Sequence, residues 1–376
     1  MKKSYILLAS TFLFVLGANC LSFQNANAQT KSSSGDVFSP GVTNFALLGE
    51  FDYGMNITKN SASFGAPEMA VMPLYRQGRF FFESGIGASF DNNGPALDVG
   101  PINLSYMLSN DWLIRVGHFD ALPFGRYPRT YDPGWINPLA TGPVGFDSIG
   151  GYDDFGFQVQ GSGFIGNTRL RAFASITNGP QLSLDPGSQG MITSASVADN
   201  NKSKMIGGRL SLNPSLSSNF SIGVSEYYTG NVGNSGTQYD GVGANLLAVD
   251  MNWAPTVTSL DGFIRLRGQL NAVHVDKANY VDGAGTYTFK NNSSALYGMF
   301  AYQPSMSSNH FLQSLMFAFM YSRAKTPSGA KWDLSSTNQY DVGLTYWFNW
   351  RTNLKADYDI QENGQNALML SVAMEL

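Results

Sequence analysis

The residues of this chain that could carry out chemistry gather in one stretch, RVGHFDALPFGRYPR, which runs from Arg115 to Arg129. The stretch contains His118 and Asp120, and Ser148 follows further along the chain. A histidine placed between a carboxylate and a serine hydroxyl can activate that hydroxyl to attack an acyl group. A hydrolase is therefore one hypothesis, although these residues are brought together only by proximity along the chain.

Metal and phosphate chemistry find less support in the sequence. The three histidines, His118, His274 and His310, lie far apart and lack the short spacing that zinc ligands share. The glycine-rich segments 207–210 and 230–236 lack the lysine of a phosphate-binding loop. We therefore expect no metal, no cofactor and no enzyme activity.

The first residues indicate export. A basic start, an apolar run at 5–16 and a small-x-small cleavage site at 26–28 have the layout of a secretory signal. They predict a cleaved signal peptide over residues 1–28, followed by a flexible leader at 29–41. The single cysteine, Cys20, lies within the signal, so the mature chain would form no disulfide.

Charge and composition narrow the class of protein. The chain has 23 Lys and Arg against 27 Asp and Glu, and loss of Lys2 and Lys3 with the signal leaves 21 against 27. This acidic balance does not suggest a nucleic-acid partner. Charged residues form only 13 % of the chain, about half the share usual in soluble domains, while aromatic residues also reach 13 %. With no later apolar run long enough for a membrane helix, an exported chain of this composition is expected to be an outer-membrane β-barrel.

Alternation with a period of two supports the barrel, because successive side chains of a strand point to opposite faces. In segment 168–178, for example, Leu170 and Ala172 alternate with Arg169 and Arg171. Sixteen segments follow this pattern and are predicted as strands: 43–57, 68–76, 79–90, 97–108, 112–119, 152–165, 168–178, 203–213, 219–229, 240–253, 262–274, 293–303, 311–323, 338–348, 352–361 and 366–376.

The connections between these segments alternate in length. Short turns follow the even-numbered strands, and most odd-numbered strands are followed by longer loops, at 120–151, 179–202, 275–292 and 324–337. Outer-membrane barrels have short periplasmic turns and longer outer loops. The alternation therefore predicts one all-β antiparallel barrel over residues 42–376, with both ends of the chain on the periplasmic side.

Aromatic residues fall near both ends of the predicted strands, as expected for girdles at the two membrane surfaces. Two charged residues disagree with the pattern, because Glu226 and Arg323 fall on the lipid-facing parity. Both lie near the outer rim, where a charge costs little, and a local bulge or a shifted register would explain them as well.

Basic residues recur on the parity that faces the barrel interior. Acidic residues share this parity, so the charges could simply pair across a wet lumen; alternatively, they create a field that selects solutes. We place the constriction at loop 120–151, because a long loop without structure of its own is usually functional. The candidate pore-lining and constriction residues are Arg115, Arg126, Arg129, Arg169, Arg171, Arg209, Arg265 and Arg267.

Several short motifs stand in this part of the chain: Arg115-Val116-Gly117-His118-Phe119, Leu122-Pro123-Phe124-Gly125, Trp135-Ile136-Asn137-Pro138 and Ile176-Thr177-Asn178-Gly179. Over residues 79–180 the sequence resembles porins similar to the phosphate-selective porin O/P group. The resemblance implies a 16-stranded diffusion channel with a loop folded into the lumen and a basic constriction. The chain departs from the group by ending in Glu375-Leu376, where many members end in Phe, and by lacking a lysine cluster in the long loop.

The sequence therefore predicts an outer-membrane porin for passive, charge-biased diffusion of small hydrophilic solutes, with anions as one option. Its expected partners are membrane lipid and these solutes, together with further copies of itself in a homotrimer by analogy. The alternatives left open are a channel for hydrophobic solutes, a barrel hydrolase and a purely structural or adhesive barrel.

Overall fold

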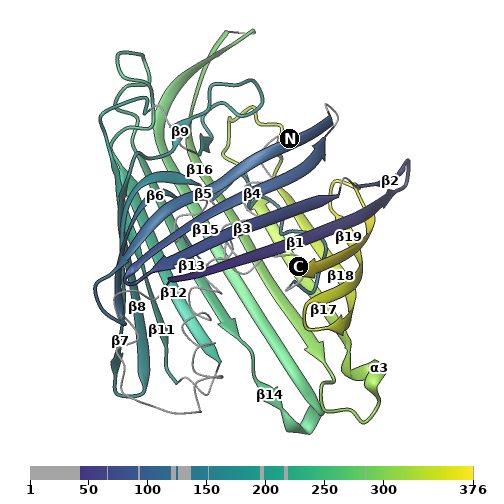
Figure 1. The fold of residues 1–376 in the computed structure, drawn as a ribbon. Helices are drawn as coiled ribbons and strands as arrows, with labels where there is room; N and C mark the ends of the chain where they lie inside the picture. Colours follow the sequence, from purple (N-terminus) through teal and green to yellow (C-terminus); the bar gives the residue numbers. More distant parts are fainter. Residues whose placement is uncertain are drawn as a thin grey trace.

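A closed antiparallel β-barrel dominates the computed structural model, and Figure 1 shows its strands inclined around a central space. The structure describes residues 43–65, 67–91, 94–119, 124–125, 137–150, 152–194, 199–215, 219–283 and 285–375. The predicted signal peptide at 1–28 and the leader at 29–41 lie outside these residues. Within them, no helix is long and apolar enough to cross a membrane.

Sixteen strands form the barrel wall in chain order. They are β1 (Thr43–Thr58), β3 (Glu68–Gln77), β4 (Phe80–Asp91), β5 (Gly94–Met107), β6 (Trp112–Phe119), β7 (Asp154–Ile165), β8 (Thr168–Thr177), β11 (Met205–Asn213), β12 (Phe220–Thr229), β13 (Ala244–Trp253), β15 (Gly262–Asp282), β16 (Gly285–Gln303), β17 (Leu315–Lys325), β18 (Thr337–Asn349), β19 (Thr352–Gln361) and β20 (Ala367–Glu375). The short elements in the connections are β2 (Ala62–Phe64), β9 (Gln181–Leu182), β10 (Ile192–Thr193), β14 (Thr256–Val257), η2 (Thr258–Leu260) and α3 (His310–Gln313).

Strand β1 closes the barrel. It pairs with β3 on one side, where Glu50 lies opposite Ala70, and with β20 on the other, where Glu50 lies opposite Glu375. Every other wall strand pairs with the wall strands before and after it in the sequence. The predicted fold class, a single antiparallel barrel of about 16 strands, is therefore confirmed, and each predicted strand corresponds to one wall strand.

One predicted connection is wrong, because residues 275–292 do not form a loop. The hairpin of β15 and β16 continues through this segment as far as Asp282 opposite Gly285. A bulge between Val275 and Ala278 shifts the register, and such an irregularity hides the alternation on which the strand prediction relied. Figure 1 shows the extended hairpin rising above the rest of the wall.

The two ends of the barrel differ. At the short-turn end, the wall strands are joined by tight turns such as Gly166-Asn167, or by the small elements β14, η2 and α3. At the long-loop end, residues between β6 and β7 and between β8 and β11 form the longest connections. Exposed aromatic residues mark the short-turn end, namely Trp112, Trp253, Phe311, Phe348 and Trp350.

The two faces of the wall follow from the strand period. On β12, Ser221 and Ser225 point inward and are buried, whereas Ile222 and Val224 point outward and are exposed. Glu226 also points outward, on the same face as Val224. The outward parity of Arg323 is likewise real, because β17 pairs without a bulge with both of its neighbours.

Candidate functional site

The long connection between β6 and β7 enters the barrel. Its described residues are Phe124, Gly125 and 137–150. The Gly125 amide donates to the Ser225 hydroxyl on the inner face of β12, at 2.9 Å. On β15, the buried Asn271 donates from Nδ2 to the carbonyl oxygen of Ile149, at 2.8 Å. These bonds fix both ends of the described loop against the lumen wall.

The middle of the loop reaches strands on the far side of the barrel. The Val144 amide donates to the Ser322 hydroxyl of β17, at 3.1 Å, and the Thr345 hydroxyl of β18 donates to the Pro138 carbonyl, at 2.6 Å. Because these partners face inward, residues 138–144 lie inside the barrel. The loop therefore occupies part of the lumen.

Asp357 on β19 is the main polar anchor of this segment. Its carboxylate accepts from the amides of Ala140, at 2.9 Å, and Thr141, at 3.1 Å. The Thr141 hydroxyl lies 2.7 Å from the same carboxylate and 2.8 Å from Asp341 on β18. A carboxylate that accepts several amide and hydroxyl protons forms charge-assisted bonds, which are stronger than bonds between neutral groups.

Apolar packing holds the loop as firmly as these bonds. Phe124, Leu139, Phe146 and Ile149 are each only 1 % exposed. The Phe146 ring meets Tyr297 of β16 edge-on, with 5.1 Å between ring centroids. Full burial of side chains of this size stabilises a fold by about 1.5–3 kcal/mol each.

The inner wall that receives the loop is apolar. Water does not reach this part of the wall, because the loop covers it, so apolar side chains are favoured on both faces of these strands. The buried inward residues that contribute to the shared cluster on β13, β16 and β17 are Ala244, Leu246, Ala248, Ala295, Tyr297, Met299, Ala301, Met316, Ala318 and Met320.

Gly125 allows the close approach where the loop enters the lumen. Its φ of +68° lies in the left-handed region, and a Cβ there would stand 2.1 Å from the side chain of Gln269. Near the other end of the loop, the Tyr152 hydroxyl accepts from the Gly150 amide at 3.2 Å. Burial raises the pKa of Tyr152, so this contact stays uncharged.

Two of the predicted pore arginines pair with carboxylates inside the wall. Arg209 forms a bidentate ion pair with Asp250, and its side chain is only 6 % exposed. Arg115 lies 3.7 Å from Glu83 and donates to the Ser105 hydroxyl. The charges of Arg209 and Arg115 are therefore largely balanced by their partners.

The structure places four other predicted arginines on the inner face near the short-turn end. Arg169 and Arg171 lie near the start of β8, and Arg265 and Arg267 lie near the start of β15. All four side chains are partly buried. Between them, β11, β12 and β13 present Asn213, Ser221 and Asn252 in nearly the same register. The last two candidates, Arg126 and Arg129, lie outside the described residues.

Acidic residues occupy the opposite wall, toward the long-loop end. Asp341 on β18 lies directly opposite Asp359 on β19, and Asp357 is two residues from Asp359 on the same inner face. All three side chains are buried. These aspartates are therefore separated from the four arginines both along the barrel axis and around it.

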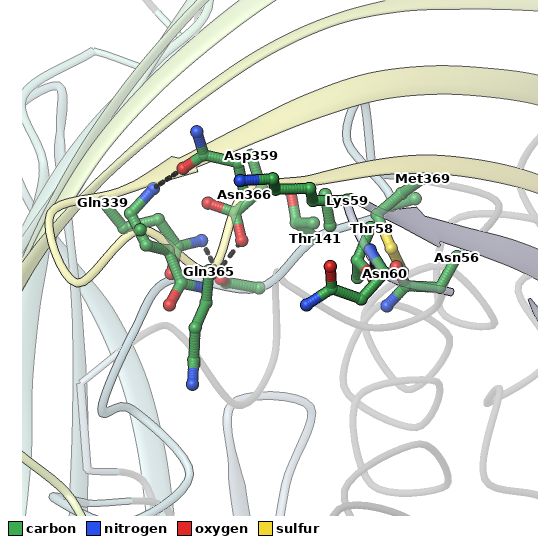
Figure 2. Close-up of a pocket in the computed structure, with 15 residues that line it drawn as sticks. Asn56, Thr58, Lys59, Asn60, Thr141, Gln339, Asp359, Gln365, Asn366 and Met369 are labelled. Atoms are coloured by element: carbon green, nitrogen blue, oxygen red, sulfur yellow. Dashed lines mark hydrogen bonds between the residues drawn. The ribbon is translucent and has the colours of Figure 1, made fainter. Parts of the chain in front are cut away.

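A cavity of about 660 Å³ opens beside this acidic wall at the long-loop end. The loop contributes one side through residues 140–142. The ends of β1, β18, β19 and β20 supply the remainder, together with the connections that follow β1 and β19. In Figure 2, Lys59 extends across the cavity toward Asp359 and Asn366. The other polar lining residues carry amides or hydroxyls and are Asn56, Thr58, Asn60, Thr141, Gln339, Gln361 and Gln365.

The residues of the hydrolase hypothesis are not brought together. His118 points outward from β6, stacks on Phe155 and lies 3.2 Å from Asp153. Ser148 belongs to the loop inside the barrel, so the strand wall separates it from His118. Asp120 lies outside the described residues.

Known proteins share the fold rather than the sequence. No protein-family model matches the chain, and no curated protein is similar to it in sequence. Among solved structures, OprB of Pseudomonas putida matches with a TM-score of 0.56 at 8 % identity, over 89 % of this chain and 94 % of that chain. The outer membrane channel DcaP of Acinetobacter baumannii matches with a TM-score of 0.54 at 14 % identity, over 90 % of this chain and 100 % of that one.

An anion-selective porin from Comamonas acidovorans also matches, with a TM-score of 0.53 at 10 % identity, over 89 % of this chain and 100 % of that chain. Likeness at such low identity establishes a common barrel architecture and nothing finer. Residue roles must therefore come from this chain's own lumen.

Proposed function

We propose that this chain is an outer-membrane porin that lets small hydrophilic solutes diffuse passively through its lumen. The observation that carries the proposal is the closed 16-strand barrel with an apolar outward face and charged side chains on its inner face. Within lipid, only a closed barrel satisfies all the backbone hydrogen bonds of a β-protein. Sixteen strands leave room for an aqueous channel. The fold shared with outer-membrane channels supports the same placement.

Purified protein inserted into a planar lipid bilayer provides the test. A diffusion channel gives stepwise increases in conductance, each step marking one inserted unit. A bilayer that stays silent while folded, heat-modifiable barrel is present would refute the porin proposal.

The selectivity we propose is a preference for anions, set near the short-turn end. Arg169, Arg171, Arg265 and Arg267 support it, because they face the lumen beside uncharged Asn and Ser side chains. Fixed positive charge beside a narrow aqueous path raises the local concentration of anions. Arg115 and Arg209 contribute less, because Glu83 and Asp250 balance them.

Reversal potentials in a salt gradient measure this preference. We expect Arg169→Ala combined with Arg171→Ala to lower the anion-to-cation permeability ratio about two- to fivefold, on the order expected for removing charge from a focusing cleft. Arg351→Ala, which changes an exposed charge in the β18–β19 turn, is the matched control. An unchanged ratio in the double variant would remove the arginine pair from the selectivity.

The constriction proposed at loop 120–151 has a separate test. Arg126 and Arg129 remain predictions from the sequence, and Arg126→Ala with Arg129→Ala should change ion selectivity if they line the path. Unchanged selectivity would assign the narrow zone to the loop segment at 138–144 instead.

The homotrimer is a further prediction, which mass photometry of the detergent-solubilised protein would check.

The structure gives little support to the alternative of a channel for hydrophobic solutes. The apolar inner wall of β13, β16 and β17 is the feature such a channel would need. Phe146 of the loop packs on Tyr297 of that wall, and Ile149 and Leu139 belong to the same buried cluster. A solute in the lumen would therefore meet the loop and the polar walls first.

A further inference from the structure

Two cations on the outside of the barrel remain unexplained by diffusion through the lumen. Arg323 and Lys325 end β17 at the long-loop end, and both side chains are exposed on the outward face. Arg323 lies opposite Leu296 of β16 and Asn338 of β18, while Lys325 lies opposite Ser294. These registers are regular, so the outward direction of both cations is a property of the fold.

The outward face of β17 changes character in order along the strand. Phe317 and Phe319 are 41 % and 37 % exposed and come first from the short-turn end. Tyr321 follows and packs beside Tyr340 of β18, with 5.2 Å between ring centroids. Arg323 and Lys325 come last. The order along the strand is therefore apolar Phe side chains, then Tyr, then cationic side chains. This order matches the hydrocarbon core, the interface and the headgroup layer of a membrane.

A third cation extends this patch along β16. Lys290 is exposed and has the same outward parity as Ser294, which lies opposite Lys325. Four residues of extended strand separate Lys290 from Ser294, which corresponds to about 13 Å. We name Arg323, Lys325 and Lys290 the outer cationic patch.

The polar neighbours of the patch leave its charge available. Asn338 is bonded to Tyr321 at 2.9 Å and to Glu362 at 2.6 Å. His274 of β15 bonds to Asn292 and lies 3.6 Å from Asp276. Among the described residues, no carboxylate forms an ion pair with Arg323, Lys325 or Lys290.

We propose that the outer cationic patch binds the phosphate groups of lipid in the outer leaflet of the membrane. The inference rests on the proposed placement in the outer membrane, and charge complementarity selects the ligand. A lipid is the occupant because the cations continue the same strand face that exposes Phe317 and Phe319 to the hydrocarbon. One ligand can therefore satisfy the apolar face and the cations together.

Lipid binding to the purified barrel in detergent tests the proposal. Bis-phosphorylated lipid A is the probe, and its fully dephosphorylated form is the matched control ligand. We expect the phosphorylated lipid to bind at least tenfold more tightly, with an affinity that falls as salt rises. Native mass spectrometry would count the bound lipid and a thermophoresis titration would give the affinity.

Variants locate the site. Arg323→Ala with Lys325→Ala should weaken binding of the phosphorylated lipid about tenfold, whereas Arg323→Lys with Lys325→Arg should retain it. Arg351→Ala removes an exposed cation at the opposite end and should leave binding unchanged. Equal affinity for both lipids, or unchanged binding by the alanine variant, would overturn the proposal.

The outcome is separable from the porin proposal. Heat-modifiable migration establishes that each variant is folded before lipid is added. If an alanine variant does not fold, the comparison of the two lipids on the unaltered protein still decides the question. Planar-bilayer conductance reports on the lumen, so a failure there would leave the lipid measurement standing.

Discussion

At the scale of single residues, position on the inner face does not decide what an arginine does. Arg209 and Arg171 share the inward parity, and parity alone would give both the same role in the channel. Asp250 forms a bidentate ion pair with the buried Arg209. Arg171 is partly buried and lies opposite Ser162 and Ser211 in the strand register. The neighbouring strands therefore determine which side chains surround each arginine.

The Arg209–Asp250 pair gives a prediction of stability. Asp250→Ala leaves a buried guanidinium without its counter-charge and should lower the free energy of unfolding by about 3–5 kcal/mol. Urea unfolding followed by tryptophan fluorescence measures the change. Asp185→Ala, at an exposed loop position, should stay within about 0.5 kcal/mol.

A double variant distinguishes the cost of an unpaired buried charge from the cost of lost packing. Arg209→Met with Asp250→Leu removes both charges and should recover most of the stability lost by Asp250→Ala. If the double variant were as unstable as the single one, the pair would stabilise the barrel through its hydrogen bonds and not through charge balance.

At the scale of elements, the inward loop behaves as a small core. Its four buried apolar side chains pack on a wall that is itself apolar, while Asp357 and Ser322 bind its backbone. The barrel needs no such loop to close, because β1 already joins β3 to β20. The loop therefore adds stability and narrows the lumen at the same time.

Removing one of these apolar anchors tests the first effect. Phe146→Ala should lower the free energy of unfolding by about 3–5 kcal/mol, because it leaves a cavity among Tyr297 and its neighbours. Phe348→Ala, at a side chain that is 61 % exposed on the outward face, is the matched control in detergent and should change stability far less. Urea unfolding measures both; equal losses would mean that the loop is not part of a packed core.

Removing the polar anchor tests the second effect. Asp357→Ala deletes the acceptor for Ala140 and Thr141, so the loop segment should move between positions. We expect single-channel records with additional conductance levels and more open-channel noise. Thr141→Val removes only the hydroxyl contact and should produce a smaller change. A quiet record at the original conductance in Asp357→Ala would show that the segment does not border the ion path.

At the scale of the whole molecule, two groups of inward charges lie toward different ends of the barrel. Arginines of β8 and β15 lie toward the short-turn end, whereas Asp341, Asp357 and Asp359 lie toward the long-loop end. The outward face is arranged along the same axis, with apolar strands between aromatic ends and the outer cationic patch beyond them. The two ends of the barrel therefore carry different charged side chains.

This asymmetry predicts rectification. With identical salt on both sides, the current through one channel should differ between positive and negative voltage, because the two mouths attract ions of opposite sign. Arg169→Ala with Arg171→Ala should make the current–voltage curve more symmetric. A linear curve in the unaltered protein at low ionic strength would contradict the axial separation of charge, since screening is weakest there.

The sequence by itself determined the barrel. Alternation along segments such as 168–178, together with short turns at one end, predicted the wall strands, because a strand between two environments must repeat every two residues. It also placed Arg169, Arg171, Arg265 and Arg267 on the inner face. The extension of the β15–β16 hairpin was not predicted, because its bulge breaks the period of two on which the strand prediction depends.

Only the tertiary structure decided which surface each residue meets. A period of two assigns a face but does not reveal what lies against that face, so the apolar inner wall of β17 was missed. Its segment LMFAFMY is apolar on both parities, a signal of burial on both sides that could have been used. The pairing of Arg209 with Asp250 and the anchoring of Thr141 by Asp357 join residues far apart in the chain. Such contacts depend on how the closed barrel brings its strands around the loop, which no local pattern encodes.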